Sequence, residues 1–457
     1  MTDPTPPAPS RTAQALLVGG APTPEGQLAT GPWRLALLFG AVGALGWFQG
    51  WGWVFIIAAL TLMIFLHELG HFVTAKWAGM KVTEFCILGI GPKIWSMRRG
   101  ETEYMVRLIP LAAYVRIIGM NNLDDTDPAD EPRAFRQQSF PKRVLVMSGG
   151  SIMHFVQAIV LFFVVFAFVG VPGDVGLAQD LGGAAPRWGV VEPLEGGNAE
   201  KAGIRAGDEI VSIDDKPVRE GDDIKSIISK RIGEEVPIVV RRDGSERTLD
   251  VLVGRNPNDR NAGFLGVSLG DIDSDTLPSV TVNPLSAVYE AGRTTGDLTW
   301  QTLRGLGAFA TGGLGDLADS VVNRDTGDDQ GPVVAPSGSG SGAESGSSSS
   351  ADENRAVSIF GIARIGADAA ENDLGEVLLL MAVVNISIGL LNMLPLLPLD
   401  GGHIAIAVYE RVRSRNGRRH MADVSRLLPL TYAVVLLLGM IMLSTVYLDI
   451  VDPIGLR

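Results

Sequence analysis

The chain has little charge and almost no cysteine, and each shortage excludes a class of protein. Of its 457 residues, 19% are charged and 46% are hydrophobic, and the mean hydropathy is +0.23. This composition is too apolar for an average soluble enzyme. The single cysteine, Cys86, excludes an internal disulfide framework and a cysteine-rich zinc site, so a metal would need histidine and carboxylate ligands. A formal net charge of -13 argues against nucleic acid as a partner.

The N-terminal region also lacks a secretory signal. It is rich in proline and has no compact basic start, apolar core and cleavage site, so we expect residues 1–32 to be a disordered tail. Residues 331–355 are dominated by glycine and serine and are expected to form a linker.

Long apolar runs dominate the rest of the chain. One ends near residue 80, and others cover residues 144–171, about 377–397 and about 427–447. Each reaches the roughly 20 residues that one helical crossing of a bilayer requires, so four core transmembrane helices are expected. Residues 35–48 leave alternatives open: a short extra span or re-entrant segment turning at Gln49-Gly50, or an interfacial segment beside nearby tryptophans.

Basic residues suggest how these helices are oriented. Eleven Lys or Arg lie between residues 76 and 143, and five Arg lie between residues 411 and 419. By the positive-inside tendency, both connections are cytoplasmic. The polar insert of residues 172–373 is then expected on the opposite side of the membrane.

Two connections alternate apolar and polar residues as strands do. Alternation on both sides of the turn sequence RRGET predicts a β-hairpin within residues 81–143, which lies against the membrane or belongs to an ordinary small sheet. Short Val/Ile-rich runs between Gly turns predict a small β-rich domain within residues 172–280, with a helix at 222–231. Residues 281–330 are expected to be amphipathic and surface-bound.

The first apolar run ends in His67-Glu68-Leu69-Gly70-His71. At i and i+4 the two imidazoles share one helical face, which is the spacing by which H-E-x-x-H binds zinc with its glutamate beside the metal-bound water. Ionisable groups at membrane depth are costly and usually functional. The alternative is a pair of interfacial histidines with a surface glutamate.

A zinc ion held by two histidines needs a third protein ligand and leaves a fourth position for water. Asp400 is the candidate, because it follows the third apolar run on the same side as the histidines. Two prolines break the helix before it, and Gly401-Gly402 is expected to let the backbone turn. Asn392 would orient a substrate or cap the broken helix, and His403 would bind metal or belong to the turn.

His154 is an isolated histidine in the second apolar run. No second ligand lies at helical spacing from it, so packing against a polar neighbour is favoured over metal binding. Gly149, Gly150 and Ser151 precede it and would allow close packing between helices.

Residues 197–218, GNAEKAGIRAGDEIVSIDDKPV, resemble the PDZ domains of bacterial membrane and envelope proteases. Such domains take peptide C-termini as an added strand. By that resemblance Gly189, Val190 and Val191 would form the strand on the carboxylate side, and Ile224 and Ile228 would line the groove. The alternative is that the domain is a spacer or plug.

HELGH, NMLPLLPLDGG and the inserted PDZ domain together resemble the site-2 protease family of intramembrane zinc metalloproteases, in particular the regulator-of-sigma-E protease type in its actinobacterial form. The resemblance covers most of residues 50–457. It implies a polytopic α-helical membrane protein of about four core helices with a membrane-associated β-hairpin and one inserted PDZ-like α+β domain. The expected segments are 1–32, 33–80, 81–143, 144–171, 172–280, 281–330, 331–355, 356–410, 411–426 and 427–457.

The same resemblance implies the chemistry. His67, His71 and Asp400 would bind one zinc ion per chain. Glu68 would be the general base toward water and then the acid toward the leaving amine, and Asn392 would contact the substrate backbone.

The resemblance also implies the setting. The enzyme would lie in the bacterial plasma membrane, with its zinc toward the cytoplasm and its PDZ-like domain outside. It would cleave single-span proteins within or near their transmembrane segments after a first cut elsewhere, and typical substrates are anti-sigma factors and remnant signal peptides.

Two departures from the family pattern stand out. Residues 110–114 lack the usual Gly-Gly pair of the hairpin, and His154 stands where the family usually has asparagine. The second departure prompts the alternative of a catalytically impaired, PDZ-containing membrane scaffold. A metal transporter is disfavoured by the small number of spans and the single ligand cluster.

Overall fold

The computed structural model describes residues 32–109, 113–120, 126–173, 175–184, 187–194, 196–218, 221–229, 231–255, 263–272, 277–308, 358–414 and 420–451. The expected tail up to residue 31, the linker at 331–355 and the arginines at 415, 418 and 419 lie outside this range. The chain divides into two compact units. The first comprises Met1–Val165, Pro284–Gly327 and Ala356–Ile454, and the second is built mainly from Phe166–Asn283.

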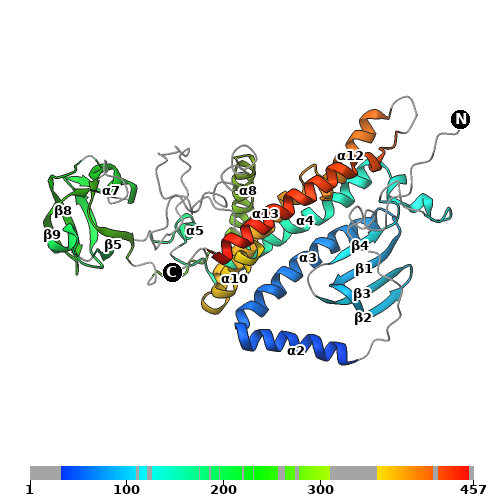
Figure 1. Ribbon diagram of the computed structural model, residues 1–457, viewed down its shortest axis with the longest axis horizontal. Coiled ribbons are helices and arrows are strands. Elements are labelled where there is room, and N and C mark those ends of the chain that lie inside the picture. The colour runs from blue at the N-terminus through cyan, green and yellow to red at the C-terminus, as the bar shows by residue number, and fades with distance from the viewer. Residues whose placement is uncertain are drawn as a thin grey trace. The chain divides into compact units, whose positions relative to one another are not determined.

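Among the described residues, four helices are long and apolar enough to cross a membrane, which confirms the expected fold class (Figure 1). They are Trp51–Trp77 (α3), Phe140–Val164 (α4) with its π-helical extension Val165–Val169, Leu374–Asn392 (α11), and Leu428–Val451 (α13), which follows the short 3-10 helix Val424–Leu427. In the first unit α4 packs against both α3 and α11.

Four further α-helices are described in the first unit. Pro32–Gln49 (α2) packs on α3 after a turn at Gly50, whose φ of 96° is left-handed and favours glycine. Ile359–Asn372 (α10) packs on α3 and α11, and Asp400–Arg413 (α12) packs on α4.

The fourth of these helices, Pro284–Ala308 (α8), differs from the expected surface-bound segment. Ala287, Ala291 and Thr295 recur every four residues on it and are buried, and the helix packs on α4 and α11. This small-residue stripe explains the difference, because it lets helix backbones approach closely.

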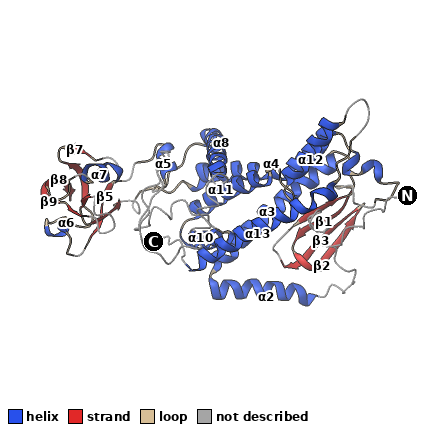
Figure 2. Ribbon diagram, turned by 45° about the horizontal axis from the view of Figure 1, so that its top comes forward, coloured by secondary structure: helices blue, strands red, loops and turns tan. Residues whose placement is uncertain are grey.

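The expected hairpin is present within a sheet of four described strands, which Figure 2 shows. Strands Ile90–Arg99 (β2) and Thr102–Ile109 (β3) pair antiparallel, and β3 pairs parallel with Val82–Leu88 (β1), which in turn pairs with Tyr114–Ile117 (β4). The order β2-β3-β1-β4 leaves β4 at an edge of the sheet, and both β1 and β4 pack on α3.

The turn of the hairpin is tied to its surroundings by Glu101. Its carboxylate accepts hydrogen bonds from Arg133 at 2.6 and 2.8 Å and from Lys76 at 2.7 Å. The bonds from Arg133 are the main reason that the pKa of Glu101 is lowered to about 2. Lys76 lies in the last turn of α3 and Arg133 in the 3-10 helix Glu131–Arg133, which Phe135–Gln137 follows, so this network fixes the sheet to α3.

The second unit contains the expected small β-rich domain. Its main sheet has the order β12-β5-β6-β8-β9, and β7 pairs with β6. The strands are Trp188–Pro193 (β5), Glu209–Ile213 (β6), Lys216–Pro217 (β7), Glu235–Arg242 (β8), Ser245–Leu252 (β9) and Val267–Asp271 (β12). Gly254–Arg255 (β10) and Gly263–Phe264 (β11) form a separate pair, and the helices are Gly176–Asp180 (α5), Asn198–Lys201 (α6) and Gly221–Ile228 (α7).

The residues expected to bind a peptide in this domain are placed differently. Gly189 and Val190 lie in β5, which pairs with β12 along one edge. Along its other edge, Gly189 pairs with Glu209 of β6 and the N–H of Val190 donates to the carbonyl oxygen of Asp208. At these two residues β5 therefore has no free edge. Val191 lies in the same strand. Ile224 and Ile228 of α7 are 2% and 3% exposed and belong to the hydrophobic core. The sheet and the core thus take up Gly189, Val190 and the two isoleucines, whereas Val191 is 41% exposed. That these five residues form the peptide groove stays a prediction.

Candidate metal centre

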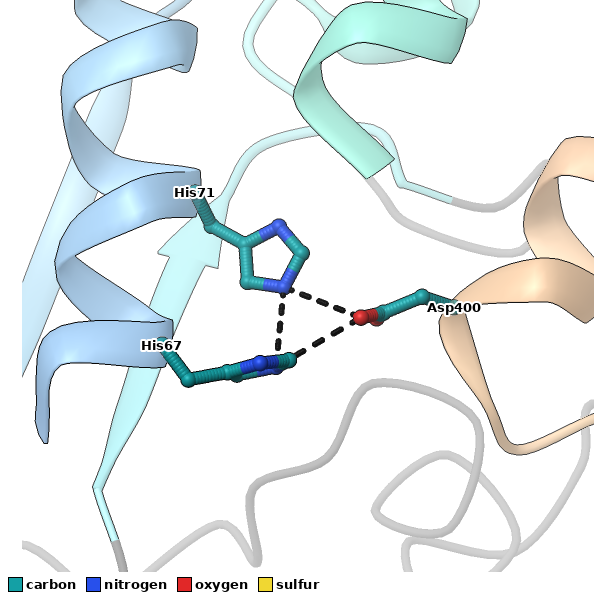
Figure 3. Close-up of side chains that lie close together, drawn as sticks. All are labelled: His67, His71 and Asp400. Carbon is teal, nitrogen blue, oxygen red and sulfur yellow. Dashed lines mark hydrogen bonds and ion pairs between the residues drawn. The ribbon is translucent and has the colours of Figure 1, made fainter. Parts of the chain in front are cut away.

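Two imidazoles and one carboxylate converge at the end of α3 (Figure 3). The Nε2 atoms of His67 and His71 are 3.2 Å apart, and they lie 3.4 and 3.2 Å from Oδ2 of Asp400, the first residue of α12. Within the described part of the chain, this is the only group of His, Cys, Asp or Glu side chains whose geometry could hold a metal ion.

The triangle of donor atoms fits zinc. Ligand atoms at about 2.0–2.1 Å from a tetrahedral zinc ion lie about 3.3 Å from one another, which matches the three observed distances. The Oδ2 atom of Asp400 is buried, and none of the described residues gives it a regular hydrogen-bond donor. A cation is the natural partner for an inward-facing carboxylate between two imidazole nitrogens.

Surrounding groups orient the ligands. Nδ1 of His71 lies 2.7 Å from the carbonyl oxygen of Val146, which can only accept, so Nδ1 donates and Nε2 keeps its lone pair toward Asp400. An aspartate binds a metal as the ionised carboxylate, and Oδ2 of Asp400 faces the two Nε2 atoms as such a ligand would.

Helix α4 passes unusually close to this group. A Cβ atom on Gly150 would lie 2.4 Å from both Cε1 of His67 and Nε2 of His71, and one on Gly149 would lie 2.8 Å from the carbonyl oxygen of Gly70. The expected close packing at Gly149 and Gly150 is confirmed. Hydropathy and motif spacing could not have shown that Gly150 lies against the ligands.

The glycines after Asp400 act differently from the expected turn. Gly401 and Gly402 lie in the first turn of α12, and a Cβ on Gly401 would lie 2.2 and 2.3 Å from the carbonyl oxygens of Met393 and Leu394. They allow the start of the helix to approach the preceding loop, and this approach carries Asp400 to the histidines.

A cavity of about 320 Å³ adjoins the three side chains. Its lining includes Glu68, residues of β4, Asn392 at the end of α11, and His403. Glu68 and Val115 of β4 both line this cavity. His403 lines the cavity without belonging to the metal-holding group.

The structure also places His154 and part of the hairpin segment at residues 110–114. Nδ1 of His154 lies 2.9 Å from Oδ1 of Asn385, which confirms that His154 packs against a polar neighbour. In the hairpin segment that departs from the family pattern, residues 110–112 lie outside the described range, and Ala113 and Tyr114 line the cavity.

Comparison with known proteins adds an independent observation. The family model described as peptidase family M50 matches residues 55–321 and 346–438. Over 430 residues the chain is 33% identical to zinc metalloprotease Rip1 of Mycobacterium tuberculosis, which covers 89% of this chain and 98% of that protein. It is 31% identical over 435 residues to Rip1 of Mycolicibacterium smegmatis, covering 89% and 99%. It is also 27% identical over 404 residues to a putative zinc metalloprotease of Clostridium perfringens, covering 88% and 99%.

Proposed function

We propose a substrate class for this chain, which belongs to peptidase family M50 and is an intramembrane zinc metalloprotease. In this proposal it cleaves single-span membrane proteins within or near their transmembrane segments. The observation that carries the proposal is the triangle of His67, His71 and Asp400 at the end of a membrane helix, with Glu68 beside it. Peptide hydrolysis in a bilayer requires water at the metal, and the adjoining cavity supplies the space for it.

In this proposal each side chain has a defined role. His67, His71 and Asp400 hold zinc, which when bound polarises a water molecule and the substrate carbonyl. Glu68 accepts the proton from that water and passes it to the leaving amine. The position of Glu68 in the cavity lining supports this role, because it puts the carboxylate beside the space that the water and the substrate would occupy.

Strand β4 offers a way to hold the substrate. It lies at the edge of its sheet, and Tyr114, Val115 and Ile117 line the cavity. A transmembrane segment must unwind before its peptide bond can reach the metal, and an edge strand can pair with the unwound backbone. We infer that the substrate adds to β4 as an extended strand, with Asn392 contacting its backbone from α11.

The sidedness and partners follow from charge and from the insert. Lys76 lies in the last turn of α3, Lys142 in the first turn of α4, and Arg411 and Arg413 in the last turn of α12. By the positive-inside tendency these basic helix ends favour a cytoplasmic location for the metal centre. The PDZ-like domain would then lie outside and read peptide C-termini left by a first cut. In its main sheet the outer strands are β12 and β9, so a peptide strand would add there rather than at β5. Anti-sigma factors and remnant signal peptides are the proposed substrates.

The test compares purified wild type with Glu68→Gln on a model single-span substrate, with and without zinc chelation. The proposal predicts cleavage by wild type, loss of cleavage with chelation, and loss of cleavage in Glu68→Gln despite a full zinc content. A catalytically impaired scaffold would bind the substrate and show no Glu68-dependent cleavage, and that result would overturn the proposal.

A further inference from the structure

His154 lies at the active-site cavity but outside the metal-holding group. It is 1% exposed, it lines the same cavity as Glu68 and Asp400, and its ring centroid lies 4.9 Å from that of His67. A buried imidazole in a membrane helix is costly unless its nitrogens have partners or a function. One nitrogen, Nδ1, has such a partner in Asn385.

The partner also fixes which nitrogen of His154 carries the proton. Nδ2 of Asn385 donates to the carbonyl oxygen of Met381 at 2.8 Å, so Oδ1 is the atom of Asn385 that faces His154. An amide oxygen can only accept, so Nδ1 of His154 is the donor. In the neutral imidazole Nε2 is then an acceptor, and among the described residues no hydrogen-bond donor is directed at it.

Packing holds this acceptor in place. A Cβ atom on Gly389 would lie 3.0 Å from Cβ of His154, so the base of the His154 side chain packs directly against α11 at Gly389. Asn385, Gly389 and Asn392 recur at i, i+4 and i+7 and therefore share one face of α11. That face carries Asn385, which orients His154, and Asn392, which lines the cavity itself.

We propose that His154 is a substrate-positioning residue, whose Nε2 accepts a hydrogen bond from a backbone N–H of the extended substrate on the cavity wall formed by α4 and α11. The inference rests on the proposed function and deepens it. Strand β4 pairs with the substrate backbone, and His154 and Asn392 meet backbone groups that this pairing leaves unsatisfied. An imidazole acceptor suits this place because backbone recognition does not depend on the substrate's side chains.

Two other roles for His154 make different predictions. A fourth metal ligand would make zinc affinity depend on His154, although its ligand atoms lie outside the group that could hold the ion. A purely structural histidine would affect stability alone. The substrate-positioning role predicts weaker substrate binding at unchanged zinc content.

The experiment measures the Kd of a synthetic single-span peptide for the zinc-loaded full chain carrying Glu68→Gln, so that binding is seen without cleavage. Into this parent we introduce His154→Gln or the double change His154→Phe with Asn385→Leu. Glutamine can donate to Asn385 through its amide nitrogen and present its oxygen to the cavity. The double change keeps an aromatic ring at position 154 and leaves no buried amide unpaired.

The double variant should bind the peptide about ten-fold more weakly, as loss of one hydrogen bond predicts, and His154→Gln should stay within about three-fold of the parent. Zinc content should be one ion per chain in all three proteins. Equal peptide affinity in the double variant, or loss of zinc from a folded variant, would overturn the inference. Whether the wild-type chain cleaves the same peptide is scored separately, so a failure of the proposed function is distinguishable from a failure of this one.

Discussion

Replacing Gly150 with alanine should destroy the metal centre although no proposed ligand is itself replaced. The new methyl group would lie 2.4 Å from Cε1 of His67, 2.4 Å from Nε2 of His71 and 2.6 Å from Nε2 of His67. Ordinary contact with a Cβ atom begins at 3.4 Å, so the imidazoles or the two helices must separate by about 1 Å.

Neither route is open at low cost. The helices cannot move apart easily, because Gly70 and Gly149 pack backbone against backbone and His71 is hydrogen-bonded to Val146 on α4 itself. The imidazoles cannot move either, because zinc sites tolerate ligand distances only within about 0.2 Å. Loss of orienting groups alone costs zinc sites about 10–100-fold in affinity, so direct displacement of two ligands should cost more than about 100-fold.

The assay is zinc affinity by competition with a chelator, together with cleavage of the model substrate. Gly439→Ala on α13 is the matched control for adding a helical methyl group, because nothing lies within 4 Å of that position, and it should behave as wild type. Gly149→Ala meets Thr74 and the backbone of Gly70, so it should force α3 and α4 apart and also lower zinc affinity. Wild-type zinc affinity in Gly150→Ala would refute the reasoning.

Four further outcomes are expected. Arg143 and Glu410 form a buried ion pair at 2.7 Å, so replacing either one with an apolar residue should lower the free energy of unfolding by about 3–5 kcal/mol, and the joint change to Met and Leu should recover most of it in denaturant titrations. Burial alone would raise the pKa of Asp208, but hydrogen bonds from Arg242 outweigh burial and lower this pKa. Its stabilisation should therefore be complete above about pH 4 and fade as pH falls through the lower folded value, seen as faster hydrogen exchange in β6 and β8 that Asp208→Asn no longer shows. Gly401→Ala, whose methyl group would overlap the backbone of Met393, should lower zinc content measured by metal analysis. Chelation should abolish cleavage, and added zinc should restore it within the same sample.

Features set by local composition could be predicted from the sequence. The four membrane helices follow from apolar length, and the hairpin and the strands of the insert follow from alternation and turn residues. The first and last residues of the helices follow less directly from composition. Helix α4 begins at Phe140 rather than Val144, because Pro141, Lys142 and Arg143 are compatible with a first helical turn but are not apolar.

Features set by contacts between distant segments could not be predicted. Neither the parallel pairing of β1 with β3 nor the enclosure of β5 between two strands has a local signal. Helix α8 was obscured because its buried face is made of alanine and threonine, which hydropathy scores poorly. The pairing of His154 with Asn385 joins residues 231 positions apart, and only the suspicion that His154 has a polar partner was available beforehand.

The metal centre depends on α4 more than on the helix that carries the histidines. Helix α3 supplies two ligands and α12 supplies the third, but α4 packs on both and also on α11. Through Val146 it orients His71, through Gly150 it leaves the space that the imidazoles fill, and through His154 it reaches α11. Because these contacts lie within two and a half turns of one helix, a small rotation of α4 would disturb ligand geometry and the substrate wall together. Substitutions along this face of α4 should therefore change zinc affinity and substrate binding in a coupled way, whereas substitutions on its exposed face, such as Val160→Ala, should change neither.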